Sequence, residues 1–168
     1  SWKKLIAEFP KVQFLAEKEN LGFSKANNKA VQLAKGEYIL LLNPDTELEG
    51  NYMQEILNFA DKQKQFGCLG VRMHDGNGHF LPESKRSIPN IFNSFEKLYT
   101  NFKNNPKKSY YRSDIGEFEV AQVEIITGAF FLCKKENYLN IGGLDESYFM
   151  YGEDIDICYT LLQNGYIN

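Results

Sequence analysis

The chain has 168 residues, of which 43% are hydrophobic, 24% are charged and 14% are aromatic. These proportions are typical of one folded globular domain and exclude a disordered tail, and the formal net charge of -3 gives no indication of a nucleic-acid partner. Tyr38–Leu42, which is as long as any apolar run in the sequence, is far too short to span a bilayer.

The three cysteines, Cys68, Cys133 and Cys158, are scattered along the chain and odd in number. They fit no metal-binding or redox spacing, so we interpret them as buried thiols of a reducing compartment. No segment resembles a signal peptide. These observations together predict a cytoplasmic protein.

The first half of the chain alternates between helical and extended patterns. Continuous hydrophobicity over Tyr38–Leu42 is typical of a strand buried on both faces of a parallel sheet. Gly36 is a natural stop for the preceding helix, and Met53, Ile56 and Ala60 share one face of the next helix. The pattern predicts helices over residues 2–8, 22–34 and 51–64 and strands over residues 12–16, 38–42 and 68–73.

The second half of the chain is less regular. The apolar spacing of Ile155, Cys158, Tyr159 and Leu162 predicts a helix near the end of the chain. In order, we expect a turn over residues 75–78, an edge strand over 80–86, a helix over 92–102, a basic connection over 104–111, one or two strands within 119–133, a Gly142-Gly143 turn and a helix over 152–163.

This alternation predicts one α/β domain over residues 1–168, with a mostly parallel central sheet and helices on both faces. A doubly wound sheet normally begins with a buried strand. This chain instead opens with a helix and stops two residues after Gly165-Tyr166, where another strand starts. We therefore expect the leading strands of the sheet to be missing.

The strand predicted over residues 38–42 ends abruptly in Asn43-Pro44-Asp45. Ligands of open α/β sheets bind beyond the carboxyl ends of the strands, and a carboxylate there can hold a hard divalent cation. A plain turn is the competing interpretation, since Asn-Pro-Asp is strong turn-forming sequence. An EF-hand calcium loop is excluded, because its twelfth position falls on Ile56 rather than on a glutamate.

A polar segment from Asn20 to Asn28 enters the helix predicted over residues 22–34. Backbone N–H groups at the start of a helix favour phosphate. An ordinary helix with Asn20 or Ser24 near its cap is the competing interpretation.

A third segment, residues 144–156, mixes acidic and aromatic residues at the start of the last helix. The helix dipole alone favours acids such as Glu153 and Asp154 in a first turn. Four aromatic or sulfur-containing side chains in succession at 148–151 are unusual in a solvent-facing loop and suggest a wall beside the acids. A carboxylate at a helix N-terminus stays ionised, which suits a general base.

Together these segments resemble family 2 glycosyltransferases, especially the bacterial rhamnosyltransferase-like branch. The resemblance implies a GT-A fold truncated at both ends, because the family's first two strands and its downstream histidine have no counterpart here. It rests on motifs in the family's order and spacing, namely Asn20-Leu21-Gly22-Phe23 with Asn27-Asn28, Gly36-Glu37-Tyr38 with Asn43-Pro44-Asp45-Thr46, Thr127-Gly128-Ala129, Ile141-Gly142-Gly143-Leu144-Asp145-Glu146, and Phe149-Met150-Tyr151-Gly152-Glu153-Asp154-Ile155-Asp156.

The resemblance further implies an inverting transfer from a nucleoside-diphosphate sugar to an acceptor hydroxyl, assisted by Mg²⁺ or Mn²⁺. By position, Asp45 is the metal ligand, and Asn43 replaces the first acid of the family's Asp-x-Asp element. Asp154 is the general base and Glu153 its helper. The donor site is expected to contain Asn20, Gly22, Asn27 and Asn28 near the diphosphate, and Gly128 and Ala129 at the junction of donor sugar and acceptor.

In this interpretation residues 1–73 form the nucleotide-sugar-binding part and residues 74–168 the acceptor and catalytic part. The donor implied first is dTDP-rhamnose, and the acceptor is a cell-surface glycan or a lipid-linked glycan. The basic, aromatic segment 95–112 fits contact with the inner face of the cell membrane, and equally a solvated insertion. An exposed sheet edge could also pair two copies into a homodimer.

Two other functions stay open. A sugar nucleotidyltransferase would need a Gly-rich loop with Arg and Lys after the first strand, a region that has no counterpart in this chain. A non-catalytic relative that binds carbohydrate or a partner protein is the second alternative. We expect the 168-residue chain by itself to have little or no transferase activity, because of the missing strands.

Overall fold

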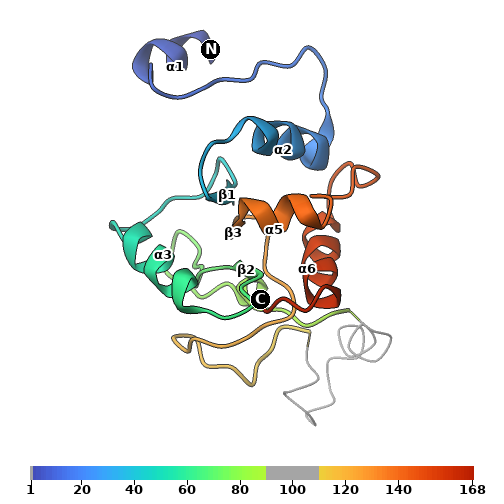
Figure 1. Ribbon diagram of the computed structural model, residues 1–168. Coiled ribbons are helices and arrows are strands. Elements are labelled where there is room, and N and C mark those ends of the chain that lie inside the picture. The colour runs from blue at the N-terminus through green and yellow to red at the C-terminus, as the bar shows by residue number, and fades with distance from the viewer. Residues whose placement is uncertain (1, 90–109) are drawn as a thin grey trace.

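Helices and strands are mixed along the chain in the computed structural model, which describes residues 2–89 and 110–168 (Figure 1). The helices predicted near residues 2–8, 22–34, 51–64 and 152–163 are all present. The elements in chain order are α1 (Trp2–Glu8), α2 (Gly22–Leu33), β1 (Tyr38–Leu42), α3 (Met53–Lys62), β2 (Cys68–Leu69), the 3₁₀ helix η1 (Pro82–Ser84), β3 (Phe130–Lys134), α5 (Lys135–Asn140) and α6 (Glu153–Gln163).

The sheet of the described residues is antiparallel, so the prediction of a mostly parallel sheet is wrong for this part of the chain. Its strand order is β1-β3-β2, and β3 runs antiparallel to both neighbours. β1 and β2 therefore run in the same direction, as the strand–helix–strand pattern around α3 requires. They are not adjacent, because β3 comes from much later in the chain and lies between them.

Burial follows this strand order. β3 is the central strand, and its residues Phe130 to Cys133 are all buried. β1 lies at an edge of the described sheet, and only Ile39 and Leu41 of its five residues are fully buried. The expectation that Tyr38–Leu42 is buried on both faces is therefore wrong, since that environment belongs to β3.

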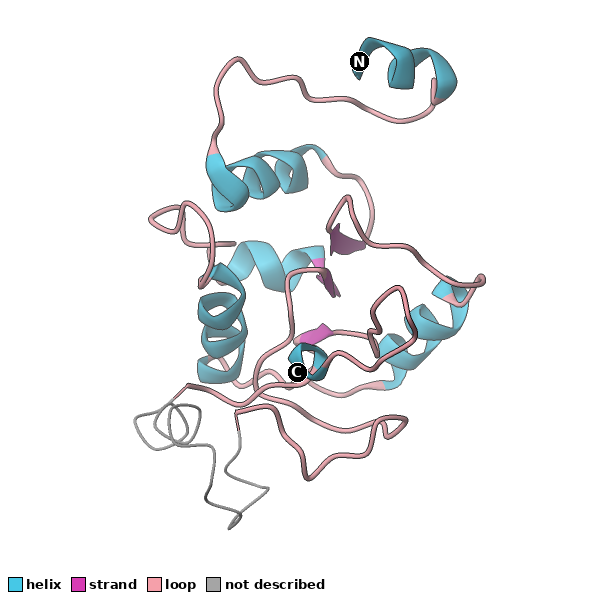
Figure 2. Ribbon diagram, turned by 180° about the vertical axis from the view of Figure 1, so that it is seen from behind, coloured by secondary structure: helices cyan, strands magenta, loops and turns pink. Residues whose placement is uncertain are grey.

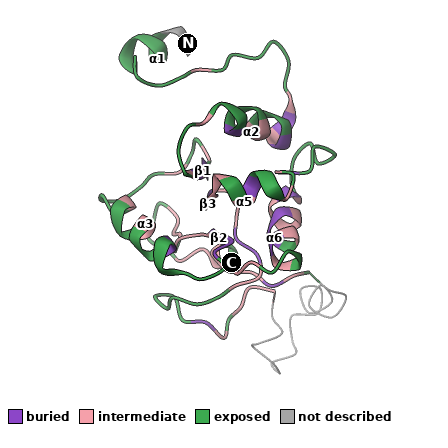
Figure 3. Cartoon of the chain, in the orientation of Figure 1, coloured by how far each residue is buried: buried purple, intermediate pink, exposed green. Residues whose placement is uncertain are grey.

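The main hydrophobic core lies between one face of the sheet and the helices α2, α5 and α6. These helices lie on one side of the strands and α3 on the other, in both opposite views of the molecule (Figures 1 and 2). Buried residues concentrate where strands and helices meet (Figure 3). The core consists of Val31, Ile39, Leu41, Cys68, Ile125, Ile126, Phe131, Cys133, Tyr138, Leu144, Ile157, Cys158 and Leu161.

Several predicted strands are shorter than expected or absent from the described residues. Residues 12–16 are irregular, and the strand predicted over 68–73 is reduced to Cys68–Leu69. Residues 80–86 contain η1 and two isolated bridges rather than a strand. These three segments have strand-like sequences, but none has a partner strand along its whole predicted length among the described residues. A strand needs such a partner for its backbone hydrogen bonds. The helix predicted over residues 92–102 lies outside the described residues.

The two ends of the described chain differ in how they are held. α1 stands apart from the other elements in both views, and its Leu5 and Ile6 are exposed. At the other end, Ile167 forms an isolated parallel bridge with Phe66, next to the predicted start of a strand at Gly165-Tyr166. Among residues 2–89 and 110–168, no helix reaches the length and hydrophobicity that crossing a membrane requires.

Candidate active site

Three segments predicted to carry the chemistry meet at the residues just before β3. The backbone N–H of Asn43 donates to the carbonyl of Ala129 (3.1 Å), so the β1–β3 ladder extends beyond β1. A Cβ atom placed on Gly128 would lie 3.7 Å from Cζ of Phe23 and 3.8 Å from Cβ of Asp154. The end of β1, the start of α2 and the start of α6 are thus joined through Gly128 and Ala129.

The start of α2 packs against the aromatic loop 148–151. The N–H of Phe23 donates to the carbonyl of Phe149 (2.9 Å), and the side chain of Asn20 accepts from the N–H of Gly22 (3.0 Å). Gly22 has a φ of 76°, and a Cβ atom there would lie 2.6 Å from the carbonyl oxygen of Phe149. Only glycine fits this contact without displacement.

The loop 148–151 is separated from Glu153 in the chain by Gly152 alone, and its side chains are exposed. Tyr151 is 83% exposed and has a φ of 69°, a left-handed conformation that is unfavourable for a tyrosine. Gly152 follows with a φ of 97° and caps α6. The loop therefore presents aromatic and sulfur-containing side chains to solvent beside the acidic start of α6.

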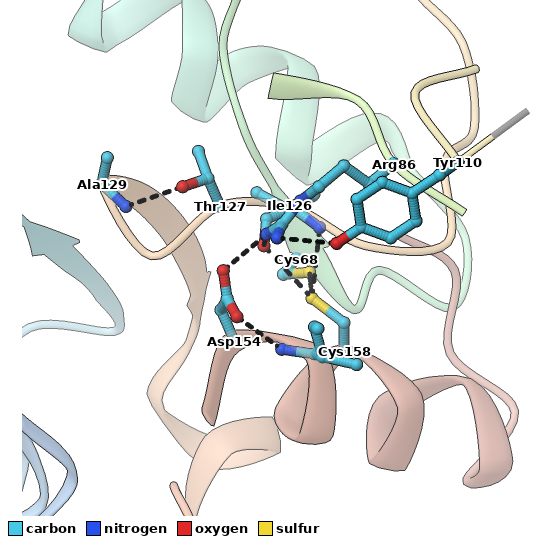
Figure 4. A network of polar contacts seen from close by, with 9 residues as sticks. Cys68, Arg86, Tyr110, Ile126, Thr127, Ala129, Asp154 and Cys158 are labelled. Atoms are coloured by element: carbon cyan, nitrogen blue, oxygen red, sulfur yellow. Dashed lines mark hydrogen bonds and ion pairs between the residues drawn. The ribbon is translucent and has the colours of Figure 1, made fainter. Parts of the chain in front are cut away.

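Asp154 forms an ion pair with Arg86, a residue that sequence analysis did not single out (Figure 4). Nη2 of Arg86 donates to Oδ2 of Asp154 at 2.5 Å and to the carbonyl of Ile126 at 3.2 Å. Nη1 of Arg86 donates to the hydroxyl of Tyr110 at 3.3 Å. The side chains of Arg86 and Asp154 are only 11% and 17% exposed, so solvent screens this pair weakly.

The guanidinium of Arg86 is a permanent positive charge among the acidic side chains at the start of α6. Burial alone would lower the pKa of Arg86, but the charge and hydrogen bond of Asp154 outweigh it, and the pKa is raised. Burial, followed by the charge of Asp145, raises the pKa of Asp156 in the same helical turn as Asp154. Arg86 therefore stays charged and compensates one of the acids at the start of α6.

Glu153, predicted to assist the base, is buried at 7% exposure. Its Oε2 atom is also buried and has no hydrogen-bond partner among the described residues. Its predicted role as a helper of Asp154 stays a prediction.

Asp45, the predicted metal ligand, is exposed in a turn that follows β1. The N–H of Thr46 donates to the carbonyl of Asn43 (3.1 Å), which closes the turn. Within residues 2–89 and 110–168, no group of three or more His, Cys, Asp or Glu side chains is arranged to hold a metal ion. A hard cation at Asp45 would thus take most of its ligands from water and from donor phosphates, a set that suits Mg²⁺.

Asn28, predicted to lie near the diphosphate, ties α2 to the loop after α5. Its Oδ1 accepts from the hydroxyl of Tyr138 (2.5 Å) and the N–H of Leu144 (3.0 Å). Its Nδ2 donates to the carbonyl of Leu144 (2.8 Å) and to Glu146 (3.1 Å). These bonds use both donors and both lone pairs of the amide, so this arrangement does not favour a phosphate contact by Asn28. Asn27 instead donates to the carbonyl of Phe23 (2.9 Å).

We expect Asn28→Ala to lower the free energy of unfolding by about 2–3 kcal/mol, because it removes the acceptor of the Tyr138 hydroxyl and the side-chain donor to the Leu144 carbonyl, and leaves the Leu144 N–H only a long bond to Tyr138 (3.4 Å). Asn27→Ala is the matched control, with an expected change below about 0.5 kcal/mol, since alanine's helix propensity offsets one lost hydrogen bond. Urea unfolding of both variants measures the difference. Equal losses of unfolding free energy in the two variants would show that the hydrogen bonds of Asn28 stabilise the fold no more than that of Asn27.

The described residues also contain a hollow of about 370 Å³, which lies away from this site. It is lined by Arg112, Gln122, Val123, Glu124, Leu162, Ile167 and Asn168. None of the predicted site residues lines it.

Comparison with known proteins agrees with the motifs that meet at Gly128. The chain matches the family described as Glycosyl transferase family 2 over residues 2–156, and it belongs to that family. The predicted family resemblance is thereby confirmed, together with a mixed α/β architecture. No solved structure matched the chain.

Several curated relatives are bacterial rhamnosyltransferases. The N-acetylglucosaminyl-diphospho-decaprenol L-rhamnosyltransferase of Mycobacterium tuberculosis (strain ATCC 25618 / H37Rv) is 26% identical, over 97% of this chain and 57% of its own length. Rhamnosyltransferase WbbL of Escherichia coli (strain K12) is 28% identical, over 83% and 54%. The low-salt glycan biosynthesis hexosyltransferase Agl10 of Haloferax volcanii is 24% identical, over 88% and 45%. The chain thus spans about half the length of these relatives.

Proposed function

We propose that this chain forms the catalytic junction of an inverting glycosyltransferase that moves a sugar from a nucleoside-diphosphate sugar to an acceptor hydroxyl. In this proposal Asp154 removes the proton from the hydroxyl while its oxygen attacks the anomeric carbon of the donor. The bond from that carbon to the diphosphate breaks, and the nucleoside diphosphate leaves. A divalent cation held by Asp45 would offset the charge that develops on the leaving diphosphate.

One observation carries the proposal. Asp154 lies against Gly128, and the adjacent Ala129 is hydrogen-bonded to Asn43, two residues before Asp45. The predicted base and the predicted metal ligand, far apart in sequence, are therefore connected through two consecutive residues. This supports one reaction centre in which proton removal and stabilisation of the leaving group are neighbours.

Two of the relatives are rhamnosyltransferases, which supports a rhamnose donor. The Mycobacterium tuberculosis relative is named for a decaprenol-linked acceptor, which supports a lipid-linked glycan as the acceptor here. Such an acceptor agrees with contact between the protein and the inner face of the membrane through residues 95–112, most of which lie outside the described residues. Homodimer formation also stays a prediction.

Transfer assays on the complete protein test the proposal. dTDP-rhamnose and UDP-sugars are each supplied with Mg²⁺ or Mn²⁺ and a lipid-linked glycan acceptor, and the product is identified by mass spectrometry and its anomeric configuration by NMR. Transfer with inversion is expected. A protein that binds no donor would favour the non-catalytic alternative, and formation of a nucleotide sugar from a sugar phosphate would favour the nucleotidyltransferase.

Cation binding is expected to be weak without the donor, because Asp45 is the one carboxylate predicted to bind the cation, and the described residues hold no group of three or more His, Cys, Asp or Glu arranged for a metal ion. Titration of Mn²⁺ followed by electron paramagnetic resonance, with and without dTDP, measures this dependence. Added dTDP should increase the affinity of the protein for Mn²⁺ at least about tenfold, after the Mn²⁺ bound to free dTDP is subtracted. Tight binding without nucleotide would contradict the expectation.

A further inference from the structure

We propose that Arg86 is a positioning residue that holds the carboxylate of Asp154 in the orientation needed to accept the acceptor's proton. The inference rests on the proposed function, and it adds a residue that no motif of the family resemblance contains. Arg86 lies 68 positions before Asp154 in the chain, and the two side chains meet only in the folded structure.

The backbone of Arg86 is held from both sides. Its N–H donates to the carbonyl of Ile125 (3.2 Å), and its carbonyl accepts from the N–H of Ile125 (2.9 Å). The next residue, Ser87, donates its N–H to the carbonyl of Tyr110 (2.8 Å), and Ile88 donates to a carboxylate oxygen of Glu124 (2.7 Å). The backbone of Arg86 is therefore hydrogen-bonded to the segment just before Gly128 and does not lie in an unattached loop.

The guanidinium of Arg86 is oriented by more than its ion pair. One nitrogen, Nη2, bridges Oδ2 of Asp154 and the carbonyl of Ile126, and Nη1 reaches the hydroxyl of Tyr110 (Figure 4). A planar group with several directed donors can satisfy these acceptors together, whereas a lysine ammonium lacks this fixed geometry. The position of Oδ2 is thereby tied, through Arg86, to the backbone of Ile125 and Ile126.

The other oxygen of Asp154 is held by its own helix. Oδ1 accepts from the backbone N–H of Ile155 (2.8 Å), one of the free N–H groups at the start of α6. A carboxylate has about four acceptor positions, and these two described bonds use one on each oxygen. The carboxylate is thus clamped at both oxygens and still has acceptor positions for an incoming hydroxyl.

Misplacing a catalytic group by about 1 Å can lower a rate by about 10²-fold. We therefore expect Arg86→Gln to lower kcat by about 10²-fold in the complete protein, with KM and the dissociation constant for the donor changed by less than about threefold. Arg86→Lys keeps the charge and should recover part of the loss, to within about tenfold of wild type. The measurements are steady-state transfer kinetics and calorimetric binding of the donor.

A double-mutant cycle separates positioning from an independent role. If Arg86 acts through Asp154, then Arg86→Gln should lower kcat no further when Asp154 is already asparagine. If Arg86 instead contacts the donor, the two losses should multiply, and this result would overturn the inference. The double variant removes both charges of the pair and therefore leaves no buried charge without its partner. Its kcat can be compared with that of Asp154→Asn even if the single Arg86→Gln protein is too unstable.

Arg72→Gln is the control. Arg72 also forms an ion pair with an acid, from its Nε to Oε1 of Glu117 at 2.9 Å, and it lies in none of the segments assigned to the site. Thermal unfolding of each variant measures the loss of stability that follows removal of the ion pair. Arg72→Gln should leave kcat unchanged, and a loss as large as that of Arg86→Gln would identify the Arg86 effect as a consequence of lower stability.

The outcomes distinguish the inference from the proposed function. An active wild-type protein, an impaired Asp154→Asn variant and a fully active Arg86→Gln variant would overturn the inference alone. A higher KM for the donor with unchanged kcat in Arg86→Gln would also overturn it. A wild-type protein that binds donor but transfers no sugar would overturn the proposed function, and the inference with it.

Discussion

Asp154→Asn is expected to lower kcat for sugar transfer by about 10²–10⁴-fold, the usual contribution of a general base. Asparagine has nearly the same shape, and its amide oxygen can still accept a hydrogen bond. It cannot take up the proton of the acceptor hydroxyl, however, so the attacking oxygen stays a weak nucleophile. Binding of the donor should change little, because the variant removes an interaction made during reaction rather than in the ground state.

The control for this variant is Asp61→Asn, which makes the same substitution on the exposed surface of α3, where Asp61 accepts a hydrogen bond from Tyr38 (2.7 Å). It should retain wild-type kcat. Circular dichroism and thermal unfolding check that Asp154→Asn is folded, since this substitution leaves the part-buried Arg86 without its anionic partner. A folded Asp154→Asn protein with more than a tenth of wild-type kcat would exclude Asp154 as the base.

Asp45→Asn is expected to lower kcat/KM by about 10²–10³-fold at millimolar Mg²⁺ or Mn²⁺. The described protein contributes one predicted carboxylate ligand to the cation, and an asparagine oxygen is a much weaker ligand for a hard cation. Part of the loss should be recovered at higher cation concentration, since the amide oxygen can still coordinate. Removal of cations with EDTA should abolish transfer in the wild-type protein.

Glu47→Gln is the matched control for Asp45→Asn, because Glu47 is an exposed acid two residues further along the same loop. Kinetics for both variants across a range of Mn²⁺ concentrations test the assignment. Glu47→Gln should stay within about twofold of wild type. Equal losses in the two variants would indicate a general charge effect of the loop and would contradict the role of Asp45.

The strand–helix–strand pattern around α3 shows which features of the fold the local sequence can predict. Tyr38–Leu42 is the strand that apolar continuity predicts, and the predicted helix follows it as Met53–Lys62. The shared direction of β1 and β2 also follows from that pattern. The choice of neighbouring strand does not follow from it, because β3 pairs with β1 and β2 across 63 to 96 positions of sequence, and no local periodicity encodes that pairing.

The candidate site shows the same division. Asp154 could be singled out from its place in the first turn of a helix, and Gly22 from its place at a helix start. Arg86 could not, since it lies in a segment interpreted as an edge strand, and a lone arginine there has no distinctive spacing. Its motif predicts that Asn28 lies near the donor, whereas its side chain forms hydrogen bonds with Tyr138, Leu144 and Glu146.

Sequence alone determined the family and the place of the main helices, and it predicted the residues whose chemistry suits sugar transfer. These properties depend on residues that are close in the chain, where periodicity, turn chemistry and motif spacing act directly. Only the tertiary structure decided that β3 is the central strand, that Gly128 and Ala129 join Asp154 to the Asn43 turn, and that Arg86 holds Asp154. Those contacts join distant segments, and they form because folding buries apolar faces and pairs part-buried charges across the whole chain.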